Sequence, residues 1–377
     1  MDLPFLPPLW QDLAAGLASC LHQRLAWRLA VLLLGALFAK GRRTVTSWLR
    51  AAHVGRGFAA YYYFLAALGR RTDWLAGLLL RRALALLAPD GPLLFAVDDS
   101  PTQRYGPRVQ GAGVHHNPTP GPTDQRFLYG HVWVTLAWVV THPLWGALGL
   151  PLRGLLYVRR KDVPRVPGRQ GWSFHTKLEL AADLVRWAAG WVRFAGRAVR
   201  AVADGAYAKR PFLRPALGLG LVVFSRLRKD ARLWGLPPAR RRPGQRGPLP
   251  TYGKERIDLA KRAGQKRGWQ QVECVQYGER VRKAVKTFEA TWRPAGGRIR
   301  VVIVREEDGW LAYFCSDPAV SAAVALEVMA DRAALEQTFK GVREVWGAGQ
   351  QQVRNAYASL GAFAVNLLMY SVVEAWA

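Results

Sequence analysis

An apolar run that ends in two adjacent carboxylates constrains the fold of this chain more than any other feature. Residues 93–97 are all apolar, follow the turn-forming pair Gly91-Pro92 and lead directly into Asp98 and Asp99. A short apolar run between turn signals is typical of a strand buried on both faces, as in the middle of an α/β sheet. Acids at the carboxyl end of such a strand lie at the sheet edge where α/β folds bind ligands.

Two interpretations of the Asp98-Asp99 pair are open. Mg²⁺ is usually held by one or two protein carboxylates together with phosphate oxygens of the substrate, so the pair is compatible with a hard-cation site. Aspartates also cap turns through their own side chains, and the following Ser-Pro sequence is compatible with that simpler role. The rest of the chain has to separate these interpretations.

The charge balance indicates a polyanionic partner. The 377 residues include 54 Lys and Arg against 26 Asp and Glu, a formal net charge of +28. Half of the residues are hydrophobic and 16 are Trp, so the excess charge belongs to a folded protein and not to a basic disordered tail. Nucleic acid is the leading candidate partner, although an Arg-rich, high-GC genome is a partial alternative cause.

Cysteine usage and hydropathy favour a cytoplasmic protein with no membrane partner. Because nucleic acid is its leading candidate partner, we expect it to associate with the nucleoid when it is bound to DNA. Cys20, Cys274 and Cys315 lie far apart in no metal-type spacing, which fits a reduced compartment. The first residues do not form a signal peptide. The long apolar C-terminal segment contains Asn366 and Glu374, which indicates a buried helix. A basic membrane-surface protein is disfavoured because no clear Lys-rich amphipathic helix is present.

Composition shifts divide the chain into four parts. Residues 1–88 predict a helical, DNA-binding domain, and residues 89–235 the first part of a catalytic core. Residues 236–318 predict a basic arm and a β-rich insertion, and residues 319–377 predict helices that complete the core. Short helices around a Gly-containing turn in residues 41–65 are compatible with a helix-turn-helix, although two ordinary packed helices would look similar.

The predicted order of elements is that of an α/β fold whose first three strands form an antiparallel meander. Residues 101–124 form a Gly/Pro-rich loop, and its His115-His116 pair has no acid or Cys at partner spacing, which favours a substrate-contacting loop over a metal site. The predicted core strands are 93–97, 130–140, 148–158, 199–204 and 219–225. The predicted insertion strands are 271–277, 281–292, 299–304 and 310–315, and the predicted helices are 174–194, 321–345 and 353–376.

Three acids stand out by their context. Asp98 or Asp99 ends the first strand, Asp204 ends the fourth, and Glu336 lies on a helix that follows the insertion. This order resembles the RNase H-like fold of DDE-type transposases, over roughly residues 90–377.

The helix around Glu336 strengthens the resemblance. Arg332, Glu336 and Arg343 match most of the Y-(2)-R-(3)-E-(6)-K signature of one group of insertion-sequence transposases. Met329 stands where that signature has Tyr, and Arg343 stands where it has Lys. The β-rich insertion and the VDDSPT and VADGAY runs also look like that group.

The resemblance implies a fold, a cofactor and a reaction. It implies that Asp98, Asp204 and Glu336 hold two Mg²⁺ ions, for which Mn²⁺ can substitute, and that the enzyme cuts transposon ends and joins their 3′ ends to target DNA. Asp98 is preferred as the first ligand because it stands two residues before the hydroxyl of Ser100, as in DGT-like motifs, while Asp99 stays open for that role. The implied partners are double-stranded DNA and a second copy of the chain in a synaptic complex.

Basic residues near these acids are candidates for binding DNA or supporting the transition state. Arg332 and Lys340 lie one turn either side of Glu336, where each could hold a carboxylate or a phosphate, and Arg343 would face the DNA backbone. The other candidates follow the fifth strand or belong to the basic arm: Arg226, Arg228, Lys229, Arg240, Arg241, Arg242, Lys254 and Arg256.

Two alternatives to a transposase are open. One is an RNase H-like nuclease that hydrolyses nucleic acid without strand transfer. The other is a catalytically inactive DNA-binding protein derived from a transposase, which Met329 in place of Tyr keeps under consideration. The sequence contains no complete Walker motif, no G-x-G-x-x-G, no nucleophile elbow and no H-E-x-x-H.

Overall fold

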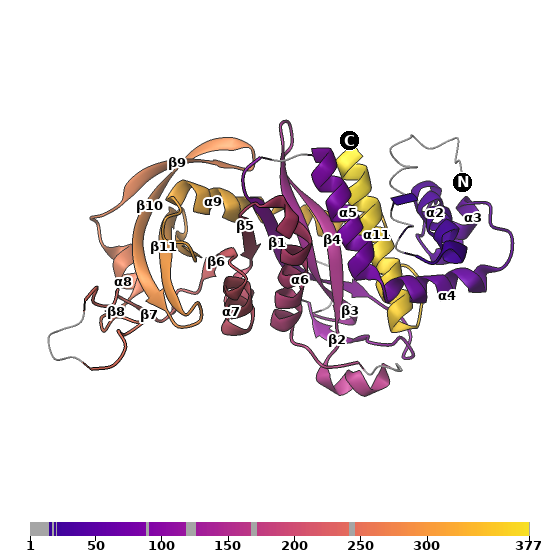
Figure 1. Cartoon of the computed structure of the whole chain (residues 1–377), viewed down its shortest axis with the longest axis horizontal. Coiled ribbons are helices and arrows are strands. Elements are labelled where there is room, and N and C mark those ends of the chain that lie inside the picture. The colour runs from indigo at the N-terminus through magenta and orange to yellow at the C-terminus, as the bar shows by residue number, and fades with distance from the viewer. Residues whose placement is uncertain are drawn as a thin grey trace.

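A mixed sheet in the middle of the chain organises the structure (Figure 1). The computed structural model describes residues 15–16, 19, 21–87, 90–117, 126–166, 172–240 and 246–376. The central strands, in spatial order, are β4 (Gly146–Tyr157), β3 (Phe127–His142), β1 (Leu93–Gln103), β5 (Val199–Ala203) and β6 (Val222–Leu227).

The directions of these strands define an RNase H-like α/β fold. Strand β3 is antiparallel to both β1 and β4, whereas β5 is parallel to β1 and β6 is parallel to β5. Parallel neighbours need crossover connections, which α6 (Lys177–Val192) and α7 (Arg210–Gly218) supply. The predicted fold class and antiparallel meander are therefore confirmed.

The pleat of β1 divides the interior into two apolar layers. Successive side chains of a strand point to opposite faces of the sheet. Leu93, Phe95 and Val97 pack into the larger core, whereas Leu94 and Ala96 pack into a smaller core on the other face. The larger core includes side chains of α6 and α7, and the smaller core includes side chains of α9 (Ala322–Asp331) and α10 (Ala334–Glu344).

The N-terminal helices are α2 (Gln23–Phe38), α3 (Val45–Ala51), α4 (Phe58–Gly69) and α5 (Thr72–Leu87). Thr44 caps α3 by accepting a hydrogen bond from the Ser47 backbone N–H at 3.1 Å. In Figure 1, α4 and α5 lie beside α11 (Ala356–Trp376). Helix α11 is long and apolar enough to cross a membrane, but 78% of its most apolar window is buried inside the protein. The prediction of a buried helix is confirmed.

The insertion extends the central sheet. Strand β12 pairs antiparallel with β6, and β11 and β10 continue the sheet outward (Figure 1). Its elements are β7 (Leu233–Trp234), β8 (Arg256–Ile257), α8 (Leu259–Gly264), β9 (Gln270–Gln276), β10 (Glu279–Trp292), β11 (Gly297–Glu306) and β12 (Gly309–Cys315). Short 3₁₀ helices lie in the connections between β4 and α7: η1 (Arg160–Arg165), η2 (Arg193–Ala195) and η3 (Gly205–Tyr207).

Several predicted boundaries were wrong. The single helix predicted over 321–345 is two helices, because the chain turns at Arg332 and Ala333 between α9 and α10. The loop predicted from residue 101 begins later, since β1 continues to Gln103 and pairs with β3. His115 and His116 lie on β2 (Gly113–His116), which also pairs with β3.

Helices α7 and α8 were not predicted. The buried thiols of Cys274 and Cys315 are free, and Cys20 lies outside the described residues.

Candidate active site

The two adjacent aspartates face opposite sides of the sheet. Asp98 continues the even-numbered positions of β1 and contacts Arg332, between α9 and α10. Asp99 continues the odd-numbered positions and contacts Lys177 on α6 and Tyr207 on η3. The alternation of a β-strand therefore gives the two carboxylates different surroundings, although they are neighbours in sequence.

Asp204 lies beside Asp98. In the parallel pairing of β1 and β5, Val97 is opposite Ala203, and Asp98 and Asp204 are the next residues of the two strands. Neighbouring strands are about 4.8 Å apart, so the two acids lie side by side at the point where the pairing of β1 with β5 ends. The Asp204 Oδ2 atom accepts a hydrogen bond from the Ala206 backbone N–H at 3.2 Å, which orients the carboxylate at the start of η3.

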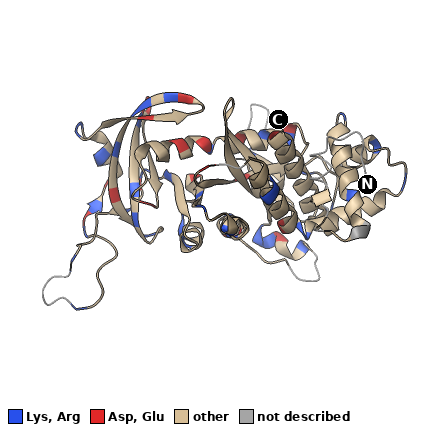
Figure 2. Cartoon of the chain, turned by 45° about the horizontal axis from the view of Figure 1, so that its top comes forward, with Lys and Arg blue, Asp and Glu red and all other residues tan. Residues whose placement is uncertain are grey.

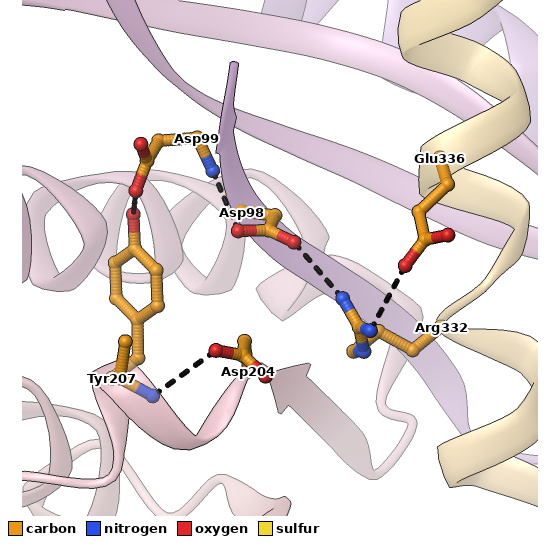
Figure 3. A network of polar contacts seen from close by, with 7 residues as sticks. Asp98, Asp99, Asp204, Tyr207, Arg332 and Glu336 are labelled. Carbon is orange, nitrogen blue, oxygen red and sulfur yellow. Dashed lines mark hydrogen bonds and ion pairs between the residues drawn. The ribbon is translucent and has the colours of Figure 1, made fainter. Parts of the chain in front are cut away.

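Arg332 joins Asp98 to Glu336. Its Nη1 lies 2.9 Å from Asp98 Oδ2, and its Nη2 lies 3.1 Å from Glu336 Oε1 (Figure 3). The Arg332 side chain is 18% exposed, whereas that of Glu336 is 64% exposed. The i,i+4 contact expected from the sequence is present, although Arg332 is the C-cap residue that follows α9 and Glu336 belongs to the first turn of α10.

The surroundings of Asp98 disfavour its charged form. Burial, followed by the neighbouring carboxylates of Asp99 and Asp204, raises the pKa of Asp98 from its ordinary value of 3.8 to about 6. The Asp99 backbone N–H and the Arg332 guanidinium act in the opposite direction without cancelling the shift. The charged form of Asp98 is therefore disfavoured mainly because the carboxylate is buried.

A second polar cluster occupies the opposite face. The Tyr207 hydroxyl donates to Asp99 Oδ1 at 2.7 Å, and Lys177 Nζ lies 2.6 Å from Asp99 Oδ2. Burial, followed by the nearby carboxylates, raises the pKa of Tyr207 well above its ordinary value, so the hydroxyl stays protonated and able to donate. Sequence reasoning noted Tyr207 only as part of a motif and missed Lys177, whose position at the start of α6 gave no functional signal.

The candidate basic residues are dispersed (Figure 2). Lys340 and Arg343 are exposed on α10, and Arg343 donates to the Phe339 carbonyl. Arg226 is exposed on β6, and its backbone lies against Gly205 in the turn after Asp204. Arg228 pairs with Asp230, and Lys229 lies over the Trp310 ring.

The basic arm lies away from the acids. Arg240, Lys254 and Arg256 are exposed near β7 and β8, at the outer end of the insertion (Figure 1). Arg241 and Arg242 lie outside the described residues.

The fold is RNase H-like, and comparison with known proteins places the chain in a class of nucleases. The family described as DDE superfamily endonuclease matches residues 16–296. The chain belongs to this family of transposase-type nucleases. The matched region contains Asp98, Asp99 and Asp204 and ends before Glu336, so it does not extend to the Y-R-E-K-like segment. No curated protein matches the chain.

DDE endonucleases generally use divalent metal ions, and the donor chemistry here fits such an ion. Carboxylate oxygens are the protein ligands that Mg²⁺ prefers, and a bound cation would stabilise the charged form of the buried Asp98 carboxylate. Among the described residues, no three His, Cys, Asp or Glu side chains converge closely enough to form a ready metal site. The Arg332 guanidinium lies between Asp98 and Glu336 instead.

Proposed function

We propose that this protein is a transposase that cuts DNA at the ends of an insertion sequence and joins the freed 3′ ends to target DNA. The observation that carries the proposal is the placement of Asp98 beside Asp204, each directly after the last paired residues of the parallel strands β1 and β5, with Glu336 facing Asp98 across Arg332. This arrangement belongs to a chain of the DDE superfamily endonuclease family.

The three acids and Arg332 have different roles in the proposed reaction. Asp98, Asp204 and Glu336 would hold two Mg²⁺ ions, for which Mn²⁺ can substitute. Bound metal ions supply an activated water and stabilise the leaving 3′ oxygen in an in-line displacement. Arg332 holds the carboxylates of Asp98 and Glu336 together in the free protein, and it can also pair with a phosphate when DNA enters.

The proposed partner is double-stranded DNA, at both the element ends and the target. A net charge of +28 supports binding to a polyanion, and exposed Lys340 and Arg343 lie on the helix that carries Glu336. Two DNA ends that are cut and joined together need two active sites, which supports a homodimer in a synaptic complex. The proposed location is the cytoplasm, with association to the nucleoid through DNA.

A nicking assay tests this function. The substrate is DNA with the ends that flank the gene, incubated with Mg²⁺, Ca²⁺ or EDTA and with wild type or Asp204→Ala. We expect cleavage and strand-transfer products only with wild type and Mg²⁺, and DNA binding by both proteins. Cleavage without joined products would indicate a nuclease, and binding without cleavage would indicate an inactive DNA-binding protein.

The basic arm gives a separate prediction. Replacing Arg240, Lys254 and Arg256 together by Gln should weaken DNA binding and reduce the salt dependence of the binding constant. Each lost phosphate contact lowers the slope of log K against log[salt] by about 0.9, so a total loss of about 2–3 is expected. Fluorescence anisotropy at several salt concentrations measures the slope.

The control for the arm prediction replaces exposed arginines on another surface, Arg186 and Arg193, by Gln. The slope of log K against log[salt] for this double variant should equal that of wild type. An unchanged slope in the arm variant would exclude the arm from the DNA-binding surface.

A further inference from the structure

We propose that Asp99 is a positioning residue, which acts through Tyr207 to hold the Asp204 carboxylate beside Asp98 and is not itself a metal ligand. This inference rests on the proposed metal-dependent function of Asp98, Asp204 and Glu336. It assigns a role to the second polar cluster, on the other face of the sheet from those acids (Figure 3).

The connection runs through the short turn that follows β5. Asp204 begins this turn, and its carbonyl accepts a hydrogen bond from the Tyr207 backbone N–H at 2.9 Å. The Tyr207 side chain then reaches back to β1, where its hydroxyl donates to Asp99 Oδ1 at 2.7 Å. The turn that carries Asp204 is therefore bonded to the residue that follows Asp98.

Burial makes this connection stiff. Tyr207 is 2% exposed, and its ring packs edge-on against Phe212 with 6.1 Å between the ring centroids. A buried hydroxyl that loses its acceptor is costly, because no water replaces the lost bond. The hydroxyl of Tyr207 therefore fixes the distance between the β5 turn and the middle of β1 at Asp99.

Lys177 forms an ion pair with the carboxylate of Asp99, the residue next to Asp98 in the sequence. It is the first residue of α6, and the helix start is set by a capping box between Thr176 and Glu179. The ion pair between Lys177 Nζ and Asp99 Oδ2 offsets the negative charge of Asp99. Without it, Asp99 would add uncompensated repulsion to the pair of acids on the other face.

The same contacts argue against Asp99 as a ligand. Both partners of the Asp99 carboxylate, Tyr207 on Oδ1 and Lys177 on Oδ2, lie on the α6 side of the sheet, whereas Asp98 contacts Arg332 on the side that carries Glu336. Its side chain also leaves β1 on the face opposite to Asp98. The alternative first ligand that the sequence left open is therefore the weaker candidate.

Mn²⁺ binding, measured by isothermal titration calorimetry without DNA, tests the inference independently of cleavage. Loss of a group that orients a ligand typically weakens metal binding by about 10–100-fold. We expect a weakening of this size for Tyr207→Phe and for Asp99→Ala. The double variant should be no weaker than either single variant, because both changes break one connection. Asp98→Asn should bind far more weakly than any of them.

Two further variants make the result specific. Asp99→Asn keeps an acceptor for the Tyr207 hydroxyl, so it should bind Mn²⁺ more tightly than Asp99→Ala. Tyr61→Phe removes the hydroxyl of another buried tyrosine, on α4, and should bind like wild type. Thermal unfolding in EDTA checks that each variant is folded, and Asp99→Asn carries the test if Tyr207→Phe does not fold.

The possible outcomes separate the inference from the proposed function. If wild type binds Mn²⁺ and both Tyr207→Phe and Asp99→Ala bind it equally well, the positioning role is overturned while the metal site stands. If Asp99→Asn loses binding as completely as Asp98→Asn, Asp99 is a ligand and the inference is wrong. If wild type binds no Mn²⁺, the proposed metal-dependent function fails, and the positioning role fails with it.

Discussion

Asparagine in place of Asp98 is expected to raise the stability of the metal-free protein at pH 8 and, in the same molecule, to remove all Mg²⁺-dependent cleavage. The activity is lost because a neutral amide replaces the proposed central metal ligand. The stability rises because the Asp98 carboxylate is ionised at pH 8 in surroundings that raise its pKa to about 6. Unfolding titrations in EDTA and the nicking assay measure the two effects.

The sign of the stability effect depends on pH. Because the folded-state pKa of about 6 lies above the ordinary 3.8, ionisation of Asp98 costs stability as the pH rises through this interval, and the full cost remains above pH 6. One pKa unit corresponds to about 1.4 kcal/mol, so the gain for Asp98→Asn is at most about 3 kcal/mol at pH 8. The gain should shrink as the pH falls from 6 and disappear near pH 4.

A matched control is Asp308→Asn in the exposed turn between β11 and β12, which should change stability little at any of these pH values. If Asp98→Asn unfolds more easily than wild type at pH 8, the ion pair with Arg332 outweighs the burial of Asp98, contrary to the expectation.

Alanine at Gly69 should destabilise the protein strongly, by about 3 kcal/mol. Helices α4 and α11 cross at Gly69 and Gly361, and a Cβ atom at Gly69 would overlap the Tyr357 backbone carbonyl. Backbone atoms cannot move aside as a flexible side chain can, so the helices must separate, and overpacking of this kind typically costs about 1–3 kcal/mol or more. Urea unfolding monitored by circular dichroism measures the loss.

Gly190 provides the control for this prediction. It lies in helix α6, and a Cβ atom there would meet nothing within 4 Å. Gly190→Ala should therefore stabilise the protein by roughly 0.5–1 kcal/mol through helix propensity alone. Equal effects of the two substitutions would show that the close approach of α4 and α11 does not limit stability.

The sequence predicted the central sheet well, because its strands carry strong local signals. Residues 93–97 and 201–203 are short apolar runs that lead into acids, and the pleat then determines which of Asp98 and Asp99 faces α10. That alternation was available from the sequence, but the side of the sheet that would carry Glu336 was not. The preference for Asp98 came from motif spacing and agrees with the observed geometry, while its role as a ligand stays a prediction.

Other features had no local signal. The break between α9 and α10 was missed because Arg332 and Ala333 are ordinary helix-forming residues, and the turn there depends on tertiary packing. Lys177 was missed because its partner Asp99 lies 78 residues earlier in the chain. Long-range pairs of this kind cannot be found by scanning for motifs in a single sequence.

The pairing of β6 with β12 has a consequence for where the proposed enzyme would cut bound DNA. Since the insertion continues the same hydrogen-bonded sheet that leads to Asp98 and Asp204, backbone pairing sets the spacing between these acids and strands β7 and β8 beside the arm. DNA that contacts both the acids and the arm would therefore bind across a fixed distance. The nick would then fall at a constant number of nucleotides from the outer edge of the protein's footprint, whatever the sequence between them.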